Sequence, residues 1–377
     1  MRDGEGMRER LAMYNRNAFK LGLFGANCSS GRAVTKVPER WSGGWADNLA
    51  LAKMADEAGL DFMLPIGRWK GYGGGSDYQG TTLESVTWAT GILAKTTRLT
   101  VFATVHAPLL HPVIAAKEFV TADHISEGRF GLNIVCGWNE GEFKMFGVAQ
   151  RDHEARYEYG QEWIDAIRMM WQRDEPFDFQ GRYIKLREVR SAPKPYGGTR
   201  PLIMNAGASP TGRVFAARNC DALFSSPRST STIEEFSADI RDAKALAAGN
   251  GRDIDVYSVG VVTCRATTAE AEEYHRHCII DSADWDAVDN ILAMRKIDPA
   301  NHTEEEYDGM RRHVAHGLGG IPIIGDPDHV AAELAKFASA GLRGIGISFV
   351  NYARELPYFR DEVLPRLEHM GLREKRR

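Results

Sequence analysis

The stretch from residue 99 to residue 135 contains two apolar runs and, between them, a segment with the pattern of a helix. It reads LTVFATV at 99–105, HPVIAAKEFVTADH at 111–124 and RFGLNIV at 129–135. The outer runs are short and nearly continuously apolar, which is typical of strands buried on both faces of a sheet. A helix between two such strands predicts that they pair in parallel, because a parallel crossover needs a connection of this length.

The same alternation of short apolar runs and helical segments extends over the rest of the chain. Eight strands are expected, at 19–24, 60–64, 99–105, 129–135, 201–206, 222–225, 256–264 and 344–350. Further helices are expected at 45–58, 83–95, 157–171, 232–248, 327–340 and 358–370. Eight such units favour a closed (β/α)8 TIM barrel over an open doubly wound sheet.

The length of 377 residues suits one (β/α)8 barrel with insertions, although length alone also allows two domains. We expect a polar N-terminal tail at 1–18 and a single barrel domain at 19–377. Two stretches exceed what a bare barrel needs, one at 174–200 with a strand-like start and a polar one at 281–320. Long insertions of this kind usually cover the C-terminal mouth of the strands.

The composition is that of an ordinary soluble globular protein, with 43% hydrophobic and 26% charged residues. The net charge of −4 argues against nucleic-acid binding. No apolar run approaches the roughly 20 residues of a membrane helix, and the charged first 17 residues do not resemble a signal peptide. Five cysteines without repeated spacing fit a reducing compartment, so we expect a cytoplasmic protein.

Two polar residues interrupt the apolar runs quoted above. Thr104 ends the run that begins at Leu99, and Asn133 lies inside the run at 129–135. Because a barrel interior holds little water, a buried Asn must find partners. Two interpretations stay open: a satisfied pair in the core, or two hydrogen-bond donors aimed at a ligand in the barrel mouth.

A candidate phosphate site follows the strand at 201–206. The segment NAGASPTGR at 205–213 leaves this strand and enters a helix, where Ser209 is placed to cap and free N–H groups suit a phosphate. Arg156, with Tyr157 at the start of another helix, has the chemistry for a bidentate phosphate contact. An ordinary capped helix and a solvated surface Arg are the alternatives.

Other motifs predict no further chemistry. His275, His277 and Cys278 do not converge on one point at their spacing, so we expect surface residues of a polar helix and no metal site. The glycine run at 71–75 lacks the Lys-Ser/Thr ending of a P-loop, which favours a flexible loop.

Short sequence blocks spread over the chain carry a resemblance to a known family. They are LDFML at 60–64, LES at 83–85, TRL at 97–99, FAT at 102–104, GRFGLN at 128–133, GW at 137–138, Glu142, RY at 156–157 and AGAS at 206–209. Together they resemble the bacterial luciferase-like superfamily of flavin-dependent monooxygenases. The nearest group contains the pyrimidine, dimethylsulfone and alkanesulfonate monooxygenases. The blocks run in order from residue 19 to 225, and a weaker match returns at 325–350.

The resemblance implies a (β/α)8 barrel that binds FMN, delivered in reduced form by a separate NAD(P)H-dependent flavin reductase. By motif matching, the FMN-binding positions are Gly67, Arg68, Asn133, Glu142, Arg156, Tyr157 and Ser209. At the first two of these the residues differ from those of the family. The positions that match the oxygen pocket of the family, and are therefore expected to be catalytic, are Leu64, Thr104 and Asn133. A homodimer or homotetramer is also implied.

The implied activity is that of a two-component monooxygenase, which uses reduced FMN and O2 to cleave a C–N or C–S bond. Its substrate would be a small polar heterocycle or an organosulfur compound. Thr104 and Asn133 would stabilise a flavin peroxide at N5 or C4a, and a well-placed donor in a dry site is worth about 2–4 kcal/mol. The alternatives are a deazaflavin-dependent oxidoreductase on the same barrel and a non-catalytic flavin-binding relative.

The sequence departs from this family where a substrate would lie, so no substrate is assigned. The departures are the loop at 27–41, Trp69, His106, Trp138 and the insertion at 281–320. Three cations of the loop, Arg32, Lys36 and Arg40, have the charge to contact an anionic substrate. Exposed loop charges are the simpler interpretation.

Overall fold

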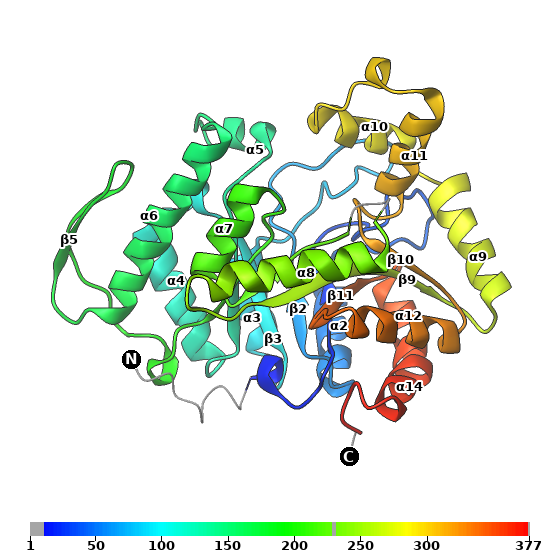
Figure 1. Cartoon of the computed structure of the whole chain (residues 1–377), viewed down its shortest axis with the longest axis horizontal. Helices are drawn as coiled ribbons and strands as arrows, with labels where there is room; N and C mark the ends of the chain where they lie inside the picture. The colour runs from blue at the N-terminus through cyan, green and yellow to red at the C-terminus, as the bar shows by residue number, and fades with distance from the viewer. Residues whose placement is uncertain (1–10, 228–230, 376–377) are drawn as a thin grey trace.

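Eight parallel strands close into a barrel in the computed structural model, which describes residues 11–227 and 231–375 (Figure 1). The strands are β1 (Lys20–Phe24), β2 (Phe62–Leu64), β3 (Thr100–His106), β4 (Phe130–Val135), β7 (Leu202–Asn205), β8 (Ala222–Phe224), β9 (Asp255–Cys264) and β11 (Gly344–Ser348). The ring closes because β9 pairs with both β8 and β11, and β11 pairs with β1. The expected (β/α)8 barrel and its eight strands are confirmed.

Two further pairings lie outside the ring. Strand β10 (Ile321–Gly325), which the sequence did not predict, runs parallel to the later part of β9, beyond the residues that pair with β8. The stretch at 174–200 contains an antiparallel hairpin of β5 (Phe177–Gln180) and β6 (Lys185–Val189), which projects to one side in Figure 1.

Helices surround the barrel close to the expected positions. They are α2 (Trp45–Glu57), α3 (Ser85–Leu93), α4 (Pro112–Ile125), α6 (His153–Gln172), α7 (Pro210–Asn219), α8 (Ile233–Ala248), α12 (Pro327–Ser339), α13 (Tyr352–Tyr358) and α14 (Leu364–His369). Helix α6 begins four residues before the expected start because Asp152 caps it, accepting from Ala155 N at 2.8 Å. Among the described residues, no helix has the length and apolar character needed to cross a bilayer.

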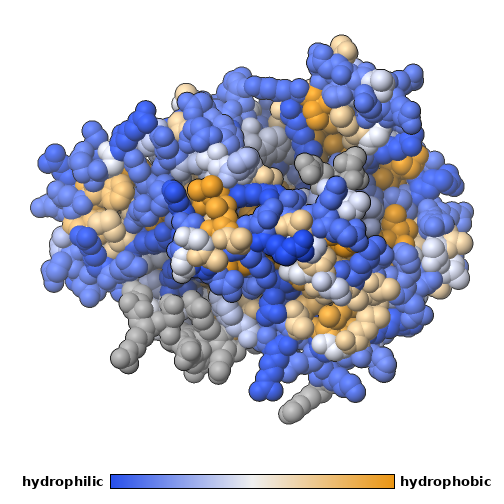
Figure 2. Space-filling view, in the orientation of Figure 1, coloured by the Kyte–Doolittle hydropathy of each residue, from blue (hydrophilic) through white to orange (hydrophobic). Residues whose placement is uncertain are grey.

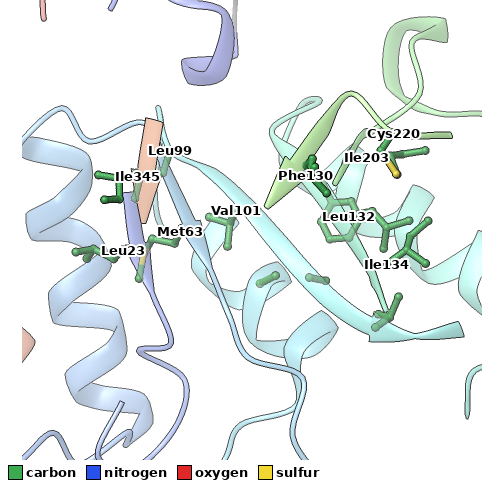
Figure 3. Close-up of a cluster of buried hydrophobic side chains, with 14 of the residues drawn as sticks. Leu23, Met63, Leu99, Val101, Phe130, Leu132, Ile134, Ile203, Cys220 and Ile345 are labelled. Carbon is green, nitrogen blue, oxygen red and sulfur yellow. The ribbon is translucent and has the colours of Figure 1, made fainter. Parts of the chain in front are cut away.

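Alternate residues of the strands face two separate cores. Outward side chains such as Leu23, Met63 and Val101 pack between the strands and the helices (Figure 3). Inward side chains, among them Phe62 and Leu64, form a fully buried cluster inside the ring. Because side chains fill the barrel, a ligand must bind at an end of the strands rather than within them.

Both ends of the described chain close the N-terminal face of the barrel. Residues 1–10 of the expected polar tail lie outside the described residues, but the rest of it packs against the strands. Met13 is 2% exposed and joins the interior cluster, and Asn17 Nδ2 donates to Asp61 Oδ1 at 2.8 Å. Arg373 forms a buried ion pair with the same carboxylate at 2.6 Å.

A third hydrophobic cluster covers the opposite, C-terminal face. It joins the loop after β1, the loop after β2 and the insertion that contains α9 (Thr268–Arg276), α10 (Trp285–Met294) and α11 (Glu304–Ala315). We call residues 26–44, 67–82 and 274–320 together the cover. Figure 1 shows α10 and α11 standing above the strands, and in Figure 2 apolar side chains gather over α10 on an otherwise mostly hydrophilic face.

The cover corrects two expectations. The insertion at 281–320 is polar only on its outer side, since Val288, Ile291 and Leu292 are buried in the third cluster. Cys278, expected on a helix surface, is fully buried in the same cluster, whereas His277 is exposed.

Candidate active site

The residues singled out from the sequence lie at the C-terminal ends of four adjacent strands or on the helices that follow them. Strands β2, β3, β4 and β7 are neighbours in the ring, so their ends form one continuous wall. Leu64, Gly67 and Arg68 belong to the end of β2 and its loop, Thr104 to β3, Asn133 to β4, Glu142 to α5 (Glu140–Met145), Arg156 and Tyr157 to α6, and Ser209 to the start of α7.

Thr104 and Asn133 are directly paired across β3 and β4. Asn133 Nδ2 donates to Thr104 Oγ1 at 3.1 Å, and Thr104 Oγ1 donates to Pro65 O at 2.6 Å. Asn133 Oδ1 is buried and has no hydrogen-bond partner among the described residues. The hydroxyl proton is therefore used within the protein, so the pair presents an unsatisfied amide acceptor and the second Nδ2 proton of Asn133 instead of two separate donors.

Leu64 lies beneath this pair. Its side chain is 1% exposed and belongs to the interior cluster, so it supplies part of an apolar floor.

Glu142 joins three segments of the wall. Its Oε1 accepts from Arg68 Nη1 at 3.0 Å and from the Trp69 backbone N–H at 2.9 Å. Its Oε2 lies 3.6 Å from His106 Nε2 and has no hydrogen-bond partner in the described chain. Burial lowers the pKa of His106 to about 4, against the effect of the Glu142 carboxylate, so the imidazole is neutral at pH 7.

Arg68 holds the positive charge of this group. Burial alone would lower the pKa of Arg68, but the neighbouring Tyr72 phenol and Glu142 carboxylate outweigh burial and raise it. Its guanidinium also lies over the rings of Tyr72 and Trp138, at 4.7 and 5.6 Å from their centroids. The result is a fixed ion pair with aromatic neighbours.

The start of α7 meets α6 at the other end of the wall. Ser209 Oγ accepts from Gly212 N at 3.1 Å, which confirms the expected cap. A Cβ atom on Gly207 or Gly212 would lie 3.0 or 2.5 Å from the Tyr157 hydroxyl, so only glycine lets this phenol approach the helix start. Arg156 Nη1 donates to the carbonyl of Gly137.

A cavity of about 810 Å³ reaches this wall from the side of α3 and α4. Gly67, Thr104 and His106 contribute to it from the strand ends, and Trp69 and Phe146 form an aromatic pair at its edge, with ring centroids 5.0 Å apart. This volume is in the range of small-molecule sites.

Buried polar atoms without partners are concentrated at this wall. Among the described residues, four of ten such side-chain atoms belong to the segment from Asn133 to Arg156: Asn133 Oδ1, Asn139 Nδ2, Glu142 Oε2 and Arg156 Nε. An unsatisfied buried polar atom costs about 1–3 kcal/mol, so their concentration indicates a polar ligand that satisfies them. The donor set fits FMN, because Arg156 and the N–H groups at the start of α7 suit its phosphate while amide and carboxylate groups suit its ring edge.

Sequence reasoning did not assign three residues of this wall. His106 lies two residues after Thr104 on β3, and the two-residue period of a strand signals that both face the same side. Asn205 Nδ2 bonds to Ile134 O at 2.7 Å, and Asn139 caps α5, a position recognisable from Asn before an acidic first turn.

Two loops differ from what the sequence suggested. In the glycine run at 71–75 and just after it, Gly75 N and Ser76 N donate to the carboxylate of Asp284, so this loop is held by α10. Arg32, expected as an exposed loop charge, is only 8% exposed, whereas Lys36 is exposed. The described residues contain no group of three His, Cys, Asp or Glu side chains arranged for a metal ion.

Comparison with known proteins agrees with the barrel fold. The profile of the luciferase-like monooxygenase family matches residues 19–344. The FMNH2-dependent dimethylsulfone monooxygenase of Pseudomonas fluorescens (strain Pf0-1) is 30% identical over 93% of this chain and 95% of its own. The pyrimidine monooxygenase RutA of Acinetobacter baylyi is 27% identical over 92% of this chain and 94% of its own. The crystal structure of DmoA from Hyphomicrobium sulfonivorans superimposes with a TM-score of 0.83 at 18% identity, covering 94% of this chain and 89% of that one.

The closed eight-stranded barrel places the protein in the TIM-barrel class. The chain belongs to the luciferase-like monooxygenase family. These relatives confirm the enzyme class and the FMN cofactor that the resemblance implied.

Proposed function

We propose that this protein is the oxygenase of a two-component FMN-dependent monooxygenase, which receives reduced FMN from a separate flavin reductase. It would insert oxygen from O2 into a small polar heterocycle or organosulfur compound and cleave a C–N or C–S bond. The observation that carries the proposal is the single wall that joins Thr104, Asn133 and Glu142 with Arg156 and Ser209. Relatives named as FMNH2-dependent dimethylsulfone monooxygenases, which match 93% and 90% of this chain, support it.

Reduced FMN supplies the electrons that activate O2, and the residues of this chain position it and exclude water. Arg156, Tyr157 and Ser209 would hold the phosphate at the start of α7. Gly67, Arg68 and Glu142 would border the ring system, since Glu142 retains one free carboxylate oxygen and a Cβ on Gly67 would lie only 2.9 Å from the Thr104 carbonyl.

Thr104 and Asn133 would act beside the reacting edge. The bond from Asn133 to Thr104 fixes the orientation of the amide, so its Oδ1 is available to an N–H group and its second Nδ2 proton to oxygen. As O2 is reduced it gains negative charge, and a donor fixed in a dry site stabilises that charge more than water does. Leu64 gives the apolar surroundings that dioxygen prefers.

FMN binding tests the phosphate site directly. Replacing Arg156 by Ala should raise the Kd for FMN at least tenfold, since a hydrogen bond to a charged group is worth about 1.5–3 kcal/mol. Fluorescence titration with oxidised FMN, and with reduced FMN under anaerobic conditions, would measure it. We expect the reduced form to bind more tightly to the unmodified protein.

Arg151→Ala is the matched control. Arg151 lies just before α6, and its guanidinium is 4.5 Å from the ring centroid of Tyr159, away from the wall. FMN affinity should be unchanged in this variant, and an unchanged affinity in Arg156→Ala would refute the phosphate assignment.

Oxygen consumption separates the proposed activity from its rivals. With a flavin reductase present, candidate heterocycles and organosulfur compounds should be screened for a product that carries ¹⁸O from labelled O2. Hydride transfer to a deazaflavin without oxygen uptake would establish the first alternative, and FMN binding without any turnover the second.

We also propose that the protein is a cytoplasmic homodimer or homotetramer. Helix α4 supports the assembly, because Val113, Ile114 and Ile125 are 39%, 52% and 46% exposed, more than apolar side chains usually are on a helix flanking a barrel. The mass in solution, measured by light scattering, tests it, and a monomer at micromolar concentration would refute it.

A further inference from the structure

Arg32 is a buried cation without a counter-ion. It is 8% exposed, Nη2 donates to the carbonyl of Gly317, and Nε has no hydrogen-bond partner among the described residues. Among the residues that the structure describes, no carboxylate lies within salt-bridge distance of the Arg32 guanidinium. A charge taken out of water without a partner destabilises the folded protein, so an anion that reached it would recover much of the lost free energy.

The groups around Arg32 are aromatic or positively charged. Its guanidinium lies 5.0 Å from the ring centroid of Phe24, at the C-terminal end of β1, and Tyr78 OH donates to its carbonyl oxygen at 3.0 Å. Burial lowers the pKa of Arg32, three neighbouring tyrosines raise it, and the guanidinium of Arg295, from the end of α10, lowers it. Two cations thus repel each other here, although the whole chain carries a net charge of −4.

This cation is linked to the candidate active site through one side chain. Gln79 Nε2 donates to Gly31 O at 2.8 Å, next to Arg32, and Gln79 Oε1 accepts from Arg68 Nε at 3.4 Å. Arg68 in turn is paired with Glu142. The charge of Arg68 is therefore neutralised by the Glu142 carboxylate, whereas the charge of Arg32 has no counter-ion in the described part of the chain.

We propose that Arg32 is a substrate-binding residue, and that the substrate carries a carboxylate or sulfonate on an aromatic or other apolar body. The inference rests on the proposed function, because it places this residue on the substrate side of the FMN site. A planar guanidinium binds either oxyanion through two parallel hydrogen bonds, and the rings of Phe24 and Tyr78 suit the apolar body.

Binding of three ring compounds to the FMN-loaded protein tests it. Benzoate and benzenesulfonate carry the two oxyanions, and benzamide is the neutral analogue; calorimetric titration gives each Kd. At least one anion should bind tenfold or more tightly than benzamide, and the comparison of the two anions shows which oxyanion the site takes. Failure of both anions to bind, or equal binding of benzamide, would overturn the proposal.

Variants of Arg32 test whether this residue causes the preference for the anion. Arg32→Gln should abolish the preference for the anion, while Lys36→Gln, which removes an exposed charge from the same loop, should retain it. If Arg32→Gln does not fold, Arg32→Lys decides: it keeps a charge but loses the bidentate geometry, so anion affinity should fall about tenfold. An unchanged preference in the variant used would overturn the assignment.

FMN titration of the same samples keeps the two proposals apart. Normal FMN binding without anion preference overturns only the role of Arg32, whereas a wild-type protein that binds no FMN overturns the proposed function. If Arg32→Gln weakens FMN binding and leaves anion binding unchanged, Arg32 belongs to the cofactor site and the proposal is wrong.

Discussion

At the scale of single residues, the hydrogen bonds of Thr104 determine what Asn133 offers to a ligand. The Thr104 hydroxyl gives its proton to Pro65 O and accepts from Asn133 Nδ2, so the amide has one orientation. Its Oδ1 is left buried and unpaired. Such an atom costs stability unless a ligand donates to it, which is why we connect this pair with ligand binding rather than with packing.

Replacing Asn133 by Ala should reduce substrate-dependent oxygen consumption about 100-fold while the Kd for FMN changes by less than threefold. Thr104→Val should act in the same direction, because it removes the group that orients the amide. Thr100→Val is the control, since it removes a buried hydroxyl from the start of the same strand, far from the mouth. Equal losses of oxygenation and FMN binding in Asn133→Ala would remove its proposed role.

At the scale of elements, the residue that caps the N-terminus of helix α10 holds the loop after β2. Asp284 caps α10, and the same carboxylate accepts from Gly75 N at 3.1 Å, from Ser76 N at 2.6 Å and from Ser76 Oγ at 2.5 Å. This one side chain therefore ties the insertion to the loop that carries Tyr72 and Tyr78 into the third cluster, which covers the C-terminal face. The glycine-rich sequence of the loop lets it follow the carboxylate closely.

Asp284→Ala should lower the free energy of unfolding by about 1–3 kcal/mol and speed proteolytic cleavage at 71–80, because two backbone N–H groups lose their acceptor. Limited proteolysis with mass spectrometry would locate the cut. Asp286→Ala removes an exposed carboxylate two residues along the same helix and should leave both properties unchanged. Identical cleavage rates in the two variants would show that Asp284 does not hold the loop.

At the scale of the whole molecule, three histidines of the C-terminal side make stability depend on pH. Burial lowers the pKa of His106 and of His275 to about 4 and that of His316 to about 3. His316 Nδ1 lies 3.2 Å from His275 Nε2, which joins α11 to α9 across the cover. In the unfolded chain each imidazole takes up a proton near pH 6.5, whereas in the folded protein the same imidazoles are protonated only at lower pH.

The unfolded state therefore binds more protons between about pH 6.5 and pH 4, and the free energy of unfolding falls as pH falls through this range. A fully buried group contributes roughly 3 kcal/mol to this loss. Urea unfolding at pH 7 and pH 5 measures it, and His316→Asn should flatten the dependence while the exposed His277→Asn should not. A wild-type protein equally stable at both values would contradict the assignment.

Local patterns predicted the barrel and much of its site. Apolar runs of strand length, helices between them, and the capping position of Ser209 depend on neighbours in sequence, so they are visible without coordinates. Thr104 and Asn133 stood out for the same reason, as polar residues within apolar runs. Their pairing across β3 and β4 required only that adjacent strands run parallel.

Long-range contacts decided the rest. Ser76 meets Asp284 across 208 positions and Arg32 meets Gly317 across 285, and neither pair shares a periodic signal. The polarity of a segment does not show which of its few apolar residues will share a core with distant loops, so the insertion looked exposed and Arg32 looked solvated. Burial is a property of the assembled chain, because a side chain leaves water only when other segments cover it. For this protein, local order along the chain was enough to specify an eight-stranded barrel, whereas the covered mouth and its unpaired cation exist only once the three segments have packed together.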